Sequence, residues 1–538
     1  MKHIYIITSC LLLLSLTVHA QFSIDPAQPF AICNASDVQN KVHAFSVNGS
    51  DYLTTWIDKR NGSAGSALYI QHLDSSGVPL LSANGQAIYT TVGKEIWAYD
   101  IAPWQNGFLI AWLEGGFGLG GDSLFCDYID ASGNHLWNQP VNVSNKTASV
   151  IYVSESGLKV MPNDSGAFIT YSLTYGGGAD VFSFNRIDFA GNLHWPINNF
   201  SITLSGYIAV PQYDNHNGFY VASCGGGIGS PIKMQHYGLD GLATFPTLID
   251  MTQGAGGRSS GWNVICDADT NAYLLWDDNL GDIQISKTDP LGNLLWPTNF
   301  KTVCGFSGSQ SNVDYYFNGN DIYVTWIDGR TPAANAFIYT QKLDTSGTAQ
   351  WTTDGVLVSS LNSYIPYPKI TMGANGNVVN TYLTGGAFRA QCLTSDSITL
   401  WQTDGIVVAT STAPFYAEYV LVSDPTGSVA AFWTDNSDIY GARVSPSGTL
   451  TNLGNIVTEK PDVYPNPASD QFVLNCKKQY SEIEIRISNI SGQEIFSKNY
   501  HHNTSSQFTL STKGLSSGLY LILVVADGDR FVNKLLVK

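Results

Sequence analysis

The feature that most constrains this chain is an internal repeat between residues 21 and 460. Each unit carries a turn of the form Leu/Ile-Asp-x-x-Gly, seen best at Leu73–Gly77, Ile129–Gly133 and Leu343–Gly347. The equivalent turn positions are Gly77, Gly133, Gly191, Gly241, Gly292, Gly347, Ser397 and Gly448. Four residues after them stand Leu81, Trp137, Trp195, Phe245, Trp296, Trp351, Trp401 and Asn452. The period is about 53 residues, a length typical of units that bury their apolar faces by packing against one another.

Each unit contains four runs of strand-forming residues. A strand that ends in an aromatic residue, such as Tyr52–Trp56 or Ile322–Trp326, is followed by a second strand such as Phe337–Leu343, which leads into the turn. One strand precedes these two, and a short apolar strand such as Val356–Val358 follows the turn. Four antiparallel strands at this period are typical of a β-propeller. We therefore predict an all-β fold with seven to eight four-stranded blades, and we favour eight because eight repeats are countable.

Tryptophan is concentrated at two positions of the repeat, the end of the second strand and the residue four places after the turn. Large rings at repeated positions are expected to pack between neighbouring blades. We therefore expect the rings that follow the turn to be mostly buried at equivalent places: Trp137, Trp195, Trp296, Trp351 and Trp401.

Two short apolar segments compete to close the ring. Phe30–Asn34 resembles the outer strand of a blade and could pair with the last repeat, and the segment around Ile456-Val457 could do the same. Closure by either would hide a strand edge that otherwise invites aggregation. The sequence leaves this choice open.

The first 20 residues predict a secretory signal peptide. Met1-Lys2-His3 precede an apolar run that ends at Val18, and cleavage is expected after Ala20. No later stretch reaches the roughly 20 uninterrupted apolar residues of a membrane crossing, so we expect no transmembrane segment. The cysteines that remain are not closely spaced, which excludes Cys-x-x-Cys motifs and favours buried thiols or a small number of disulfides.

The chain is acidic, with a net charge of -17. From Pro461 onward basic and acidic residues nearly balance, so the acidic excess belongs to the repeats. Such a surface repels nucleic acid and anionic lipid, and we expect no nucleic-acid partner.

The sequence changes character at Pro461, after the polar connector Thr458–Lys460. Apolar and polar residues alternate in Glu482–Asn489, a turn follows at Ser491–Gln493, and a further strand runs through Gly518–Val525. This pattern predicts a small immunoglobulin-like β-sandwich. We place the signal peptide at 1–20, the propeller at 21–460 and the C-terminal domain at 461–538.

Three motifs mark the C-terminal domain: Tyr464–Pro467, Ile490–Glu494, and Leu515–Tyr520 leading to Lys534–Lys538. Over its full length the domain resembles the type A sorting domain of the type IX secretion system, known from the Bacteroidota. The resemblance implies that the secretion machinery and its sorting protease are partners. It also implies passage through the periplasm, removal of the domain at the outer membrane, and release of the remainder or its attachment to the cell surface. The implied site residues are Tyr464, Pro465, Asn466, Pro467, Gly492, Gly518, Tyr520, Lys534 and Lys538.

The repeats themselves resemble, more loosely, those of secreted bacterial propeller proteins, patterned Trp-x-Asp-x-Arg-x-Gly before a Tyr-x-Gln strand. Trp56–Gly62 and Trp326–Arg330 carry this pattern best. The turns differ from the Asp-boxes of sialidases, which have Asp-x-Gly after a serine or threonine, whereas Asp-x-x-Gly is the rule here. Sialidase chemistry is therefore not implied.

Carboxylates recur just beyond the second-strand aromatic residue: Asp58, Glu114, Asp277, Asp278, Asp328 and Asp435. A residue needed once for catalysis has no reason to recur in every blade, whereas a carboxylate that accepts hydrogen bonds from turn N–H groups does. We interpret them as turn-stabilising residues and predict no catalytic residue. Asp267–Asn271 has the alternating oxygen ligands of a calcium loop but lacks the distal glutamate, so a turn is favoured and calcium is the alternative.

Within the units, the connection from the second-strand aromatic residue to the turn varies in length, and variable loops on a rigid ring are where recognition usually occurs. The loops that join neighbouring blades supply aromatic residues that could stack on a sugar or peptide: Trp97, Tyr207, Trp262, Tyr364 and Tyr367. Two functional hypotheses follow. In the first, the propeller is a non-catalytic module that binds a glycan, matrix or cell-surface partner. In the second, it is a glycan-degrading enzyme exported by the same route.

Overall fold

The computed structural model describes residues 22–116, 121–147, 150–175, 180–197, 201–202, 208–225, 227–330, 336–362, 368–384, 386–410, 419–435, 437–451, 461–476, 482–489, 494–501, 505–526 and 529–538. The chain divides into two compact units, with the division between Asn452 and Leu453. Both units consist of antiparallel sheets, and the described helical residues are the short 3-10 turns η1 (Gly62–Ala64) and η2 (Ala374–Gly376). The expected signal peptide, residues 1–20, lies outside the described residues.

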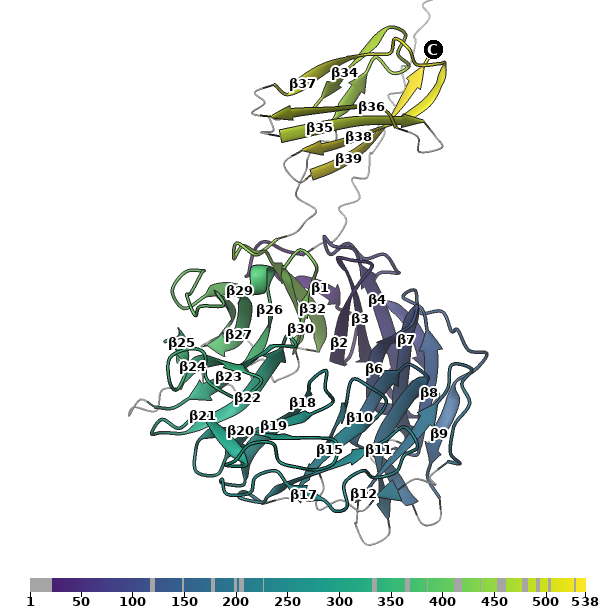
Figure 1. Cartoon of the computed structure of the whole chain (residues 1–538). Coiled ribbons are helices and arrows are strands. Elements are labelled where there is room, and N and C mark those ends of the chain that lie inside the picture. Colours follow the sequence, from purple (N-terminus) through teal and green to yellow (C-terminus); the bar gives the residue numbers. More distant parts are fainter. Residues whose placement is uncertain are drawn as a thin grey trace, which may run out of the picture. The chain divides into compact units, whose positions relative to one another are not determined.

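The first unit contains eight four-stranded sheets in the described part of the chain, arranged around a common centre (Figure 1). From inner to outer strand, blade 1 is β2 (Gln39–Val47), β3 (Asp51–Asp58), β4 (Ala67–Leu73) and β5 (Gln86–Thr90); blade 2 is β6 (Glu95–Trp104), β7 (Gly107–Gly115), β8 (Ser123–Ile129) and β9 (Val141–Asn145); blade 3 is β10 (Val150–Asn163), β11 (Gly166–Tyr175), β12 (Asp180–Ile187) and β13 (Ser201–Ile202); and blade 4 is β14 (Ile208–Tyr213), β15 (Phe219–Cys224), β16 (Ile232–Tyr237) and β17 (Ile249–Asp250).

Blade 5 is β18 (Arg258–Cys266), β19 (Ala272–Asp278), β20 (Ile283–Thr288) and β21 (Phe300–Cys304); blade 6 is β22 (Gln310–Phe317), β23 (Asp321–Asp328), β24 (Phe337–Asp344) and β25 (Val356–Ser359); blade 7 is β26 (Lys369–Met372), β27 (Val378–Thr384), β28 (Ala387–Leu393) and β29 (Ile406–Thr410); and blade 8 is β30 (Tyr419–Ser423), β31 (Val429–Asp435), β32 (Asp438–Val444) and β1 (Phe30–Cys33). Each inner strand contacts the inner strands of both neighbouring blades, including β2 with β30, so the sheets form a complete ring. The unit is an eight-bladed β-propeller.

The N-terminal strand β1 closes this ring. It pairs antiparallel with β32, with Phe30 opposite Gly441 and Cys33 opposite Ile439. The backbone N–H of Gln39 in blade 1 also donates to the carbonyl of Ser437 in blade 8 at 2.8 Å. The N-terminal candidate therefore supplies the outer strand of blade 8, and Ile456-Val457 lies outside the described residues.

A buried polar network joins the same two blades. Arg443 Nη2 lies 2.7 Å from Asp424 Oδ2, and both side chains are almost fully buried. The Tyr52 hydroxyl in blade 1 donates to the same oxygen at 2.7 Å. Charged groups are retained at such depth only when they are paired and hydrogen-bonded, which this network achieves across the closing contact.

The second-strand aromatic residues form the plates between sheet layers. Four of them stack on the ring directly opposite in the third strand, with interplanar angles of 22° to 25°: Trp56 on Tyr69, Trp112 on Phe125, Trp326 on Tyr339 and Trp433 on Tyr440. All four tryptophans are buried, as repeated packing positions require.

The tryptophans after the turn are buried or partly buried, and none of the five is exposed. Trp296 and Trp401 are 8% and 9% exposed, whereas Trp137, Trp195 and Trp351 are only half-buried. Three of the five indole N–H groups donate to the turn of the next blade: Trp137 to the carbonyl of Phe189, Trp351 to that of Ser395, and Trp401 to that of Pro446. The rings therefore join adjacent blades, and the burial of all five agrees with the expectation that they are mostly buried.

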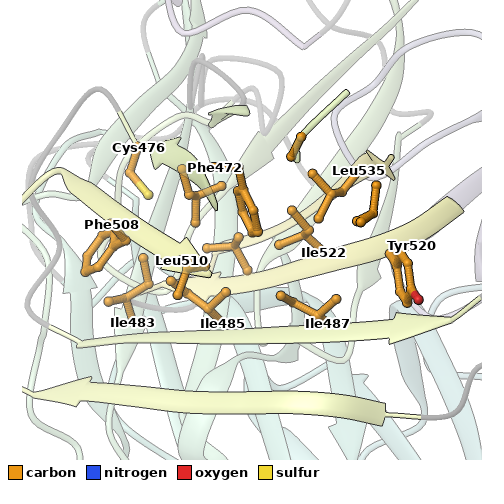
Figure 2. Packing of buried hydrophobic residues seen from close by; sticks show 14 residues of the cluster. Phe472, Cys476, Ile483, Ile485, Ile487, Phe508, Leu510, Tyr520, Ile522 and Leu535 are labelled. Atoms are coloured by element: carbon orange, nitrogen blue, oxygen red, sulfur yellow. The ribbon is translucent and has the colours of Figure 1, made fainter. Parts of the chain in front are cut away.

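The C-terminal unit is a two-sheet β-sandwich. One sheet has the order β33 (Asp462–Tyr464), β34 (Gln471–Asn475), β37 (Gln507–Ser511); the other has the order β36 (Glu494–His501), β35 (Glu482–Asn489), β38 (Gly518–Ala526), β39 (Asp529–Val537). Side chains from both sheets fill the space between them, including Phe472, Ile485 and Ile522, each fully buried (Figure 2). Among the described residues, this core shares no member with those of the propeller.

The seven cysteines of the described chain are buried free thiols. Burial raises the pKa of Cys33 and Cys476 to about 11. The expectation of buried small side chains agrees with this arrangement, and the described residues contain no disulfide.

Candidate functional site

The recurring carboxylates are built into the blades. Asp58 Oδ1 accepts from Arg60 Nε at 2.9 Å, and Asp58 Oδ2 accepts from the indole N–H of Trp56 at 3.0 Å. Arg60 Nη2 also donates to the carbonyl of Asn84 at 2.8 Å, and its guanidinium lies 4.0 Å from the centre of the Tyr69 ring. The carboxylate thus fixes an arginine that ties the second strand to the segment before the outer strand.

Blade 6 repeats this arrangement around Asp328. Arg330 Nε donates to Oδ1 at 2.8 Å and Trp326 donates to Oδ2 at 2.8 Å, while Arg330 Nη2 reaches the carbonyl of Asp354 at 2.7 Å. Burial would raise the pKa of Asp328, but the hydrogen bonds from Arg330 and Trp326 hold it below its usual value. We call these two sets, Trp56/Asp58/Arg60 and Trp326/Asp328/Arg330, the arginine clamps.

The other recurring carboxylates also bind local partners. Asp277 accepts from the backbone N–H groups of Gly261 at 2.8 Å and Asn312 at 3.1 Å, the second across a blade boundary. Asp278 accepts from the N–H groups of Leu280 and Asp282.

Glu114 accepts from Lys94 Nζ at 2.9 Å and from the Tyr89 hydroxyl at 3.1 Å. Burial, followed by the negative charge of Glu114, raises the pKa of Tyr89 to about 12. Asp435 lies half-buried at the end of β31. The turn-stabilising interpretation fits the geometry of Asp58, Asp277, Asp278 and Asp328, whereas Glu114 holds side chains rather than a turn.

The candidate calcium loop is a hydrogen-bonded turn. Asp267 Oδ1 accepts from the backbone N–H groups of Asp269 at 3.0 Å and Asn271 at 2.9 Å, and Asp267 Oδ2 lies 3.1 Å from Lys287 Nζ. Across the described part of the chain, no group of three or more His, Cys, Asp or Glu side chains is placed to hold a metal ion.

Two inner-strand aspartates were missed by the sequence reading. Asp100 in blade 2 accepts from the N–H of Val160 in blade 3 at 2.7 Å, and Asp314 in blade 6 accepts from the N–H of Ile370 in blade 7 at 3.0 Å. Each stands beside a tyrosine whose hydroxyl donates to a carbonyl of the preceding blade: Tyr99 to Lys41 and Tyr315 to Val264. The sequence signal is the adjacent Tyr/Asp pair on an inner strand, and its function is again to link blades.

Register shifts interrupt several inner strands, for example between Asn40 and His43 in blade 1 and between Ser311 and Asp314 in blade 6. The extra residues include Lys41 and Asn312, which adopt positive φ angles of 54° and 56°. Bulges of this kind turn side chains out of the regular alternation and bend the strand. The sequence pattern gave no indication of them.

The predicted loop aromatics are only partly described. Trp97 is half-buried, and Trp262 is buried with the Arg258 guanidinium 5.3 Å from its ring centre. Packing therefore accounts for Trp262. Tyr207, Tyr364 and Tyr367 lie outside the described residues.

The first and last motifs of the C-terminal domain meet at Asn466. Its Nδ2 donates to the carbonyl of Lys534 at 2.7 Å, and its Oδ1 accepts from the N–H of Leu536 at 2.9 Å. Ala468 continues the contact, donating to the carbonyl of Leu536 and accepting from the N–H of Lys538. The segment that begins Tyr464-Pro465 is thereby fixed along the last strand, with Tyr464, Pro465, Asn466 and Pro467 all exposed.

The remaining motif residues support the same strand. Gly518 pairs with Val537 in β38 and β39, and the buried Tyr520 donates its hydroxyl to the carbonyl of Ser516 at 2.9 Å. Lys534 and Lys538 are exposed on β39 and at the C-terminus. Gly492 lies outside the described residues. Of the predicted motif residues, the structure therefore brings together those of the first and last motifs.

Comparison with known proteins identifies the C-terminal domain. Residues 462–538 match the family model described as "Secretion system C-terminal sorting domain". The match supports export of the chain as a cargo of type IX secretion, to the cell surface or the extracellular space. No curated protein matches the chain significantly. No helix in the described residues is long and apolar enough to cross a membrane.

Solved structures match the chain only distantly. The Hadza microbial sialidase Hz136 is 10% identical with a TM-score of 0.33, and the match covers 56% of this chain and 66% of that one. An ulvan lyase of polysaccharide lyase family PL25 is 10% identical with a TM-score of 0.35 and coverages of 56% and 83%. Prolyl oligopeptidase B from Galerina marginata is 9% identical with a TM-score of 0.39 and coverages of 74% and 55%. Likeness at this level gives no basis for comparing sites.

Proposed function

We propose that the propeller is a non-catalytic binding module that acts outside the cell on a glycan, matrix or cell-surface partner. The observation that carries this proposal is the use of the recurring carboxylates. Asp58 and Asp328 bind arginines, Asp277 binds backbone N–H groups, and Glu114 binds a lysine. A glycosidase needs two carboxyl groups free to face a substrate, so these side chains serve the scaffold instead.

The C-terminal domain acts as the address label in this proposal. Its exposed first motif, fixed on the last strand through Asn466, offers the secretion machinery a rigid surface of residues 464–467 with Lys534 and Lys538 beside it. The sorting protease would then remove the domain, and the remainder would be released or attached to the surface. Residues 1–20 would direct the preceding step across the inner membrane.

The binding function is tested with the mature full-length chain. The chain is applied to a glycan array, to immobilised matrix proteins and to whole cells. Each glycan that binds the chain is then incubated with it and analysed for shortened products. Binding without product supports the proposal. Product formation would replace it with the glycan-degrading alternative, and absence of binding to all three targets would overturn it.

A further inference from the structure

Three large apolar side chains project from connections at one end of blades 4 and 5. Ile228 is 78% exposed, Leu280 is 72% exposed and Phe306 is 43% exposed. Ile228 and Leu280 precede the third strands β16 and β20, and Phe306 follows the outer strand β21. Because Ile283 of β20 pairs with Cys304 of β21, Leu280 and Phe306 lie at the same end of blade 5.

Backbone hydrogen bonds join these connections into one surface. The N–H of Gly229 donates to the carbonyl of Arg258 at 2.8 Å, and the N–H of Asn279 donates to the carbonyl of Gly257 at 2.8 Å. The N–H of Gln310 then donates to the carbonyl of Gly281 at 2.9 Å. The exposed side chains therefore stand on loops whose geometry is fixed before any ligand arrives, which lowers the entropic cost of binding.

Phe306 is held by the arginine clamp of blade 6. The Arg330 guanidinium lies 3.8 Å from the centre of the Tyr339 ring and 4.6 Å from that of Phe306. Since Tyr339 stacks on Trp326 in turn, a ladder of planar groups runs from the buried core to the exposed Phe306. The aromatic ring at its end is oriented by cation–π contact rather than left to rotate freely.

The clamp itself does not need an aromatic residue there. In blade 1 the N–H of Asn34 donates to Asn84, just as the N–H of Gly305 donates to Asp354 in blade 6. The next residue is Ala35 beside the clamp of blade 1 and Phe306 beside the clamp of blade 6, while the clamp distances in the two blades agree within a few tenths of an ångström. Packing of the clamp therefore gives no reason for an exposed ring at residue 306.

Asn279 adds hydrogen-bonding capacity to this surface. It is exposed and stands between Ile228 and Leu280, since a Cβ placed on Gly229 would lie 3.5 Å from Asn279 Nδ2. An aromatic ring, aliphatic side chains and an amide together suit a sugar, whose C–H face packs on apolar groups while its hydroxyls bond to polar ones. The acidic excess of the propeller disfavours a polyanion.

We propose that Ile228, Asn279, Leu280 and Phe306, together the loop platform, bind the apolar face of a neutral polysaccharide. This inference rests on the proposed binding function and gives it a location and a ligand class. Phe306 supplies the stacking surface, and Leu280 and Ile228 extend it.

The test measures retention of the mature full-length chain in affinity gels containing β-1,3-glucan, xyloglucan, mannan or, as the polyanion, a sulfated galactan. The variants are F306A and L280S, with L291S as the matched control. Leu291 is 67% exposed on blade 5, but it follows β20 whereas Leu280 precedes it. We expect wild type and L291S to bind at least one neutral polysaccharide, and F306A and L280S to bind it about tenfold more weakly. All variants should have the melting temperature of the wild type, because the clamp of blade 1 forms beside an alanine, Ala35.

The results separate the platform from the broader function. Wild-type affinity in F306A and L280S, with the wild type binding a neutral polysaccharide, overturns the platform and leaves the binding function standing. Retention by the sulfated galactan only, or by none of the gels, also overturns the platform, and the array, matrix and cell experiments then decide the broader proposal separately.

Discussion

The ring of Phe22 lies directly against the backbone of Gly77, so closely that a Cβ on Gly77 would come within 2.7 Å of two ring carbons. Trp296 stands in the same relation to Gly347, and Trp401 to Gly448. In those blades the tryptophan comes from the preceding repeat. Phe22 therefore supplies the ring that the eighth repeat lacks, because Asn452 stands at its tryptophan position.

Replacing Phe22 with alanine should open this closing contact. Phe22 is fully buried and meets the rings of Phe30, Tyr52 and Phe432. Loss of a buried phenylalanine costs about 3 to 5 kcal/mol, and we expect the free energy of unfolding in chemical denaturation to fall by that amount. The control I24A, at a residue 58% exposed, should change it by less than about 0.5 kcal/mol. Equal stability of F22A and I24A would show that the N-terminal segment does not close the ring.

The repeat made the propeller and its blade number predictable, but not the closing strand. Phe30–Cys33 and the segment near Ile456 are both short and apolar, and an outer strand demands little more of a sequence. What distinguishes the first is Phe22, eight residues upstream of β1, which occupies a tryptophan site that is visible only in three dimensions. In the sequence, Phe22 and Phe30–Cys33 are separated from the eighth repeat by almost the whole propeller.

The candidate site was predictable to a similar degree. Repetition of Asp58 and Asp328 pointed to a structural role, and the clamps agree with it. The loop platform was not foreseen, since exposed Leu280 and Phe306 look like ordinary loop residues until strand pairing brings them to one end of blade 5. Bulges at Lys41 and Asn312 were not foreseen, because each adds one residue to a short inner strand and the resulting change in alternation spans too few residues to be recognised in the sequence.

Glycine at position 355 should be far more sensitive to substitution than glycine at position 319 of the same blade. Both have positive φ angles, +80° and +95°, so alanine is strained at each. A Cβ on Gly355 would also lie 2.5 Å from the Trp326 ring, whereas nothing lies within 4 Å of one on Gly319. We expect G319A to cost about 1 kcal/mol and G355A to cost at least about 2 kcal/mol more, measured by thermal and chemical unfolding. Similar losses would mean that the Trp326 ring moves aside freely.

Removing the charge of Asp424 should destabilise the propeller in a pH-dependent way. Burial would raise the pKa of Asp424, but bonds from Thr426, Tyr52 and Arg443 hold it below its usual value. The ionised form therefore stabilises the fold at neutral pH, and this contribution is lost as the pH falls through the lowered pKa. We expect D424N to cost about 3 to 5 kcal/mol at pH 7, because Arg443 stays buried without its partner.

The difference between D424N and the wild type should begin to shrink below about pH 4, where the Asp424 carboxyl of the unfolded wild-type chain starts to bind a proton, and should shrink further as the pH falls through the lowered pKa of the folded form. Unfolding curves between pH 3 and pH 8 measure it. The control D396N, at an exposed turn residue, should follow the wild type throughout. A constant difference across this range would show that the loss comes from packing and not from the ion pair.

Asn466 should matter more to export than its exposed position suggests. Alanine there removes both hydrogen bonds that fix the first motif to the last strand, and we expect the C-terminal domain to lose about 1 to 2 kcal/mol of stability. Faster hydrogen exchange at the Leu536 amide would report the loosened strand, and a lower yield of exported protein would report its consequence. S469A, at the exposed residue three places later, should leave both unchanged. Unaltered exchange and export in N466A would remove the hydrogen-bonded contact from the sorting role.

Deleting residues 461–538 should leave a folded propeller in the periplasm. The ring is closed by β1 and Phe22 from the N-terminus, so it needs no strand from beyond residue 451. The sandwich has its own buried core, and units with separate cores fold independently.

Inner-membrane passage would still depend on residues 1–20, whereas outer-membrane translocation would lose its address. Cell fractionation with a protease-protection assay measures the location, and an unchanged melting temperature of the propeller confirms its fold. Recovery of the truncated chain outside the cell at the wild-type level would show that the sorting domain is dispensable for export.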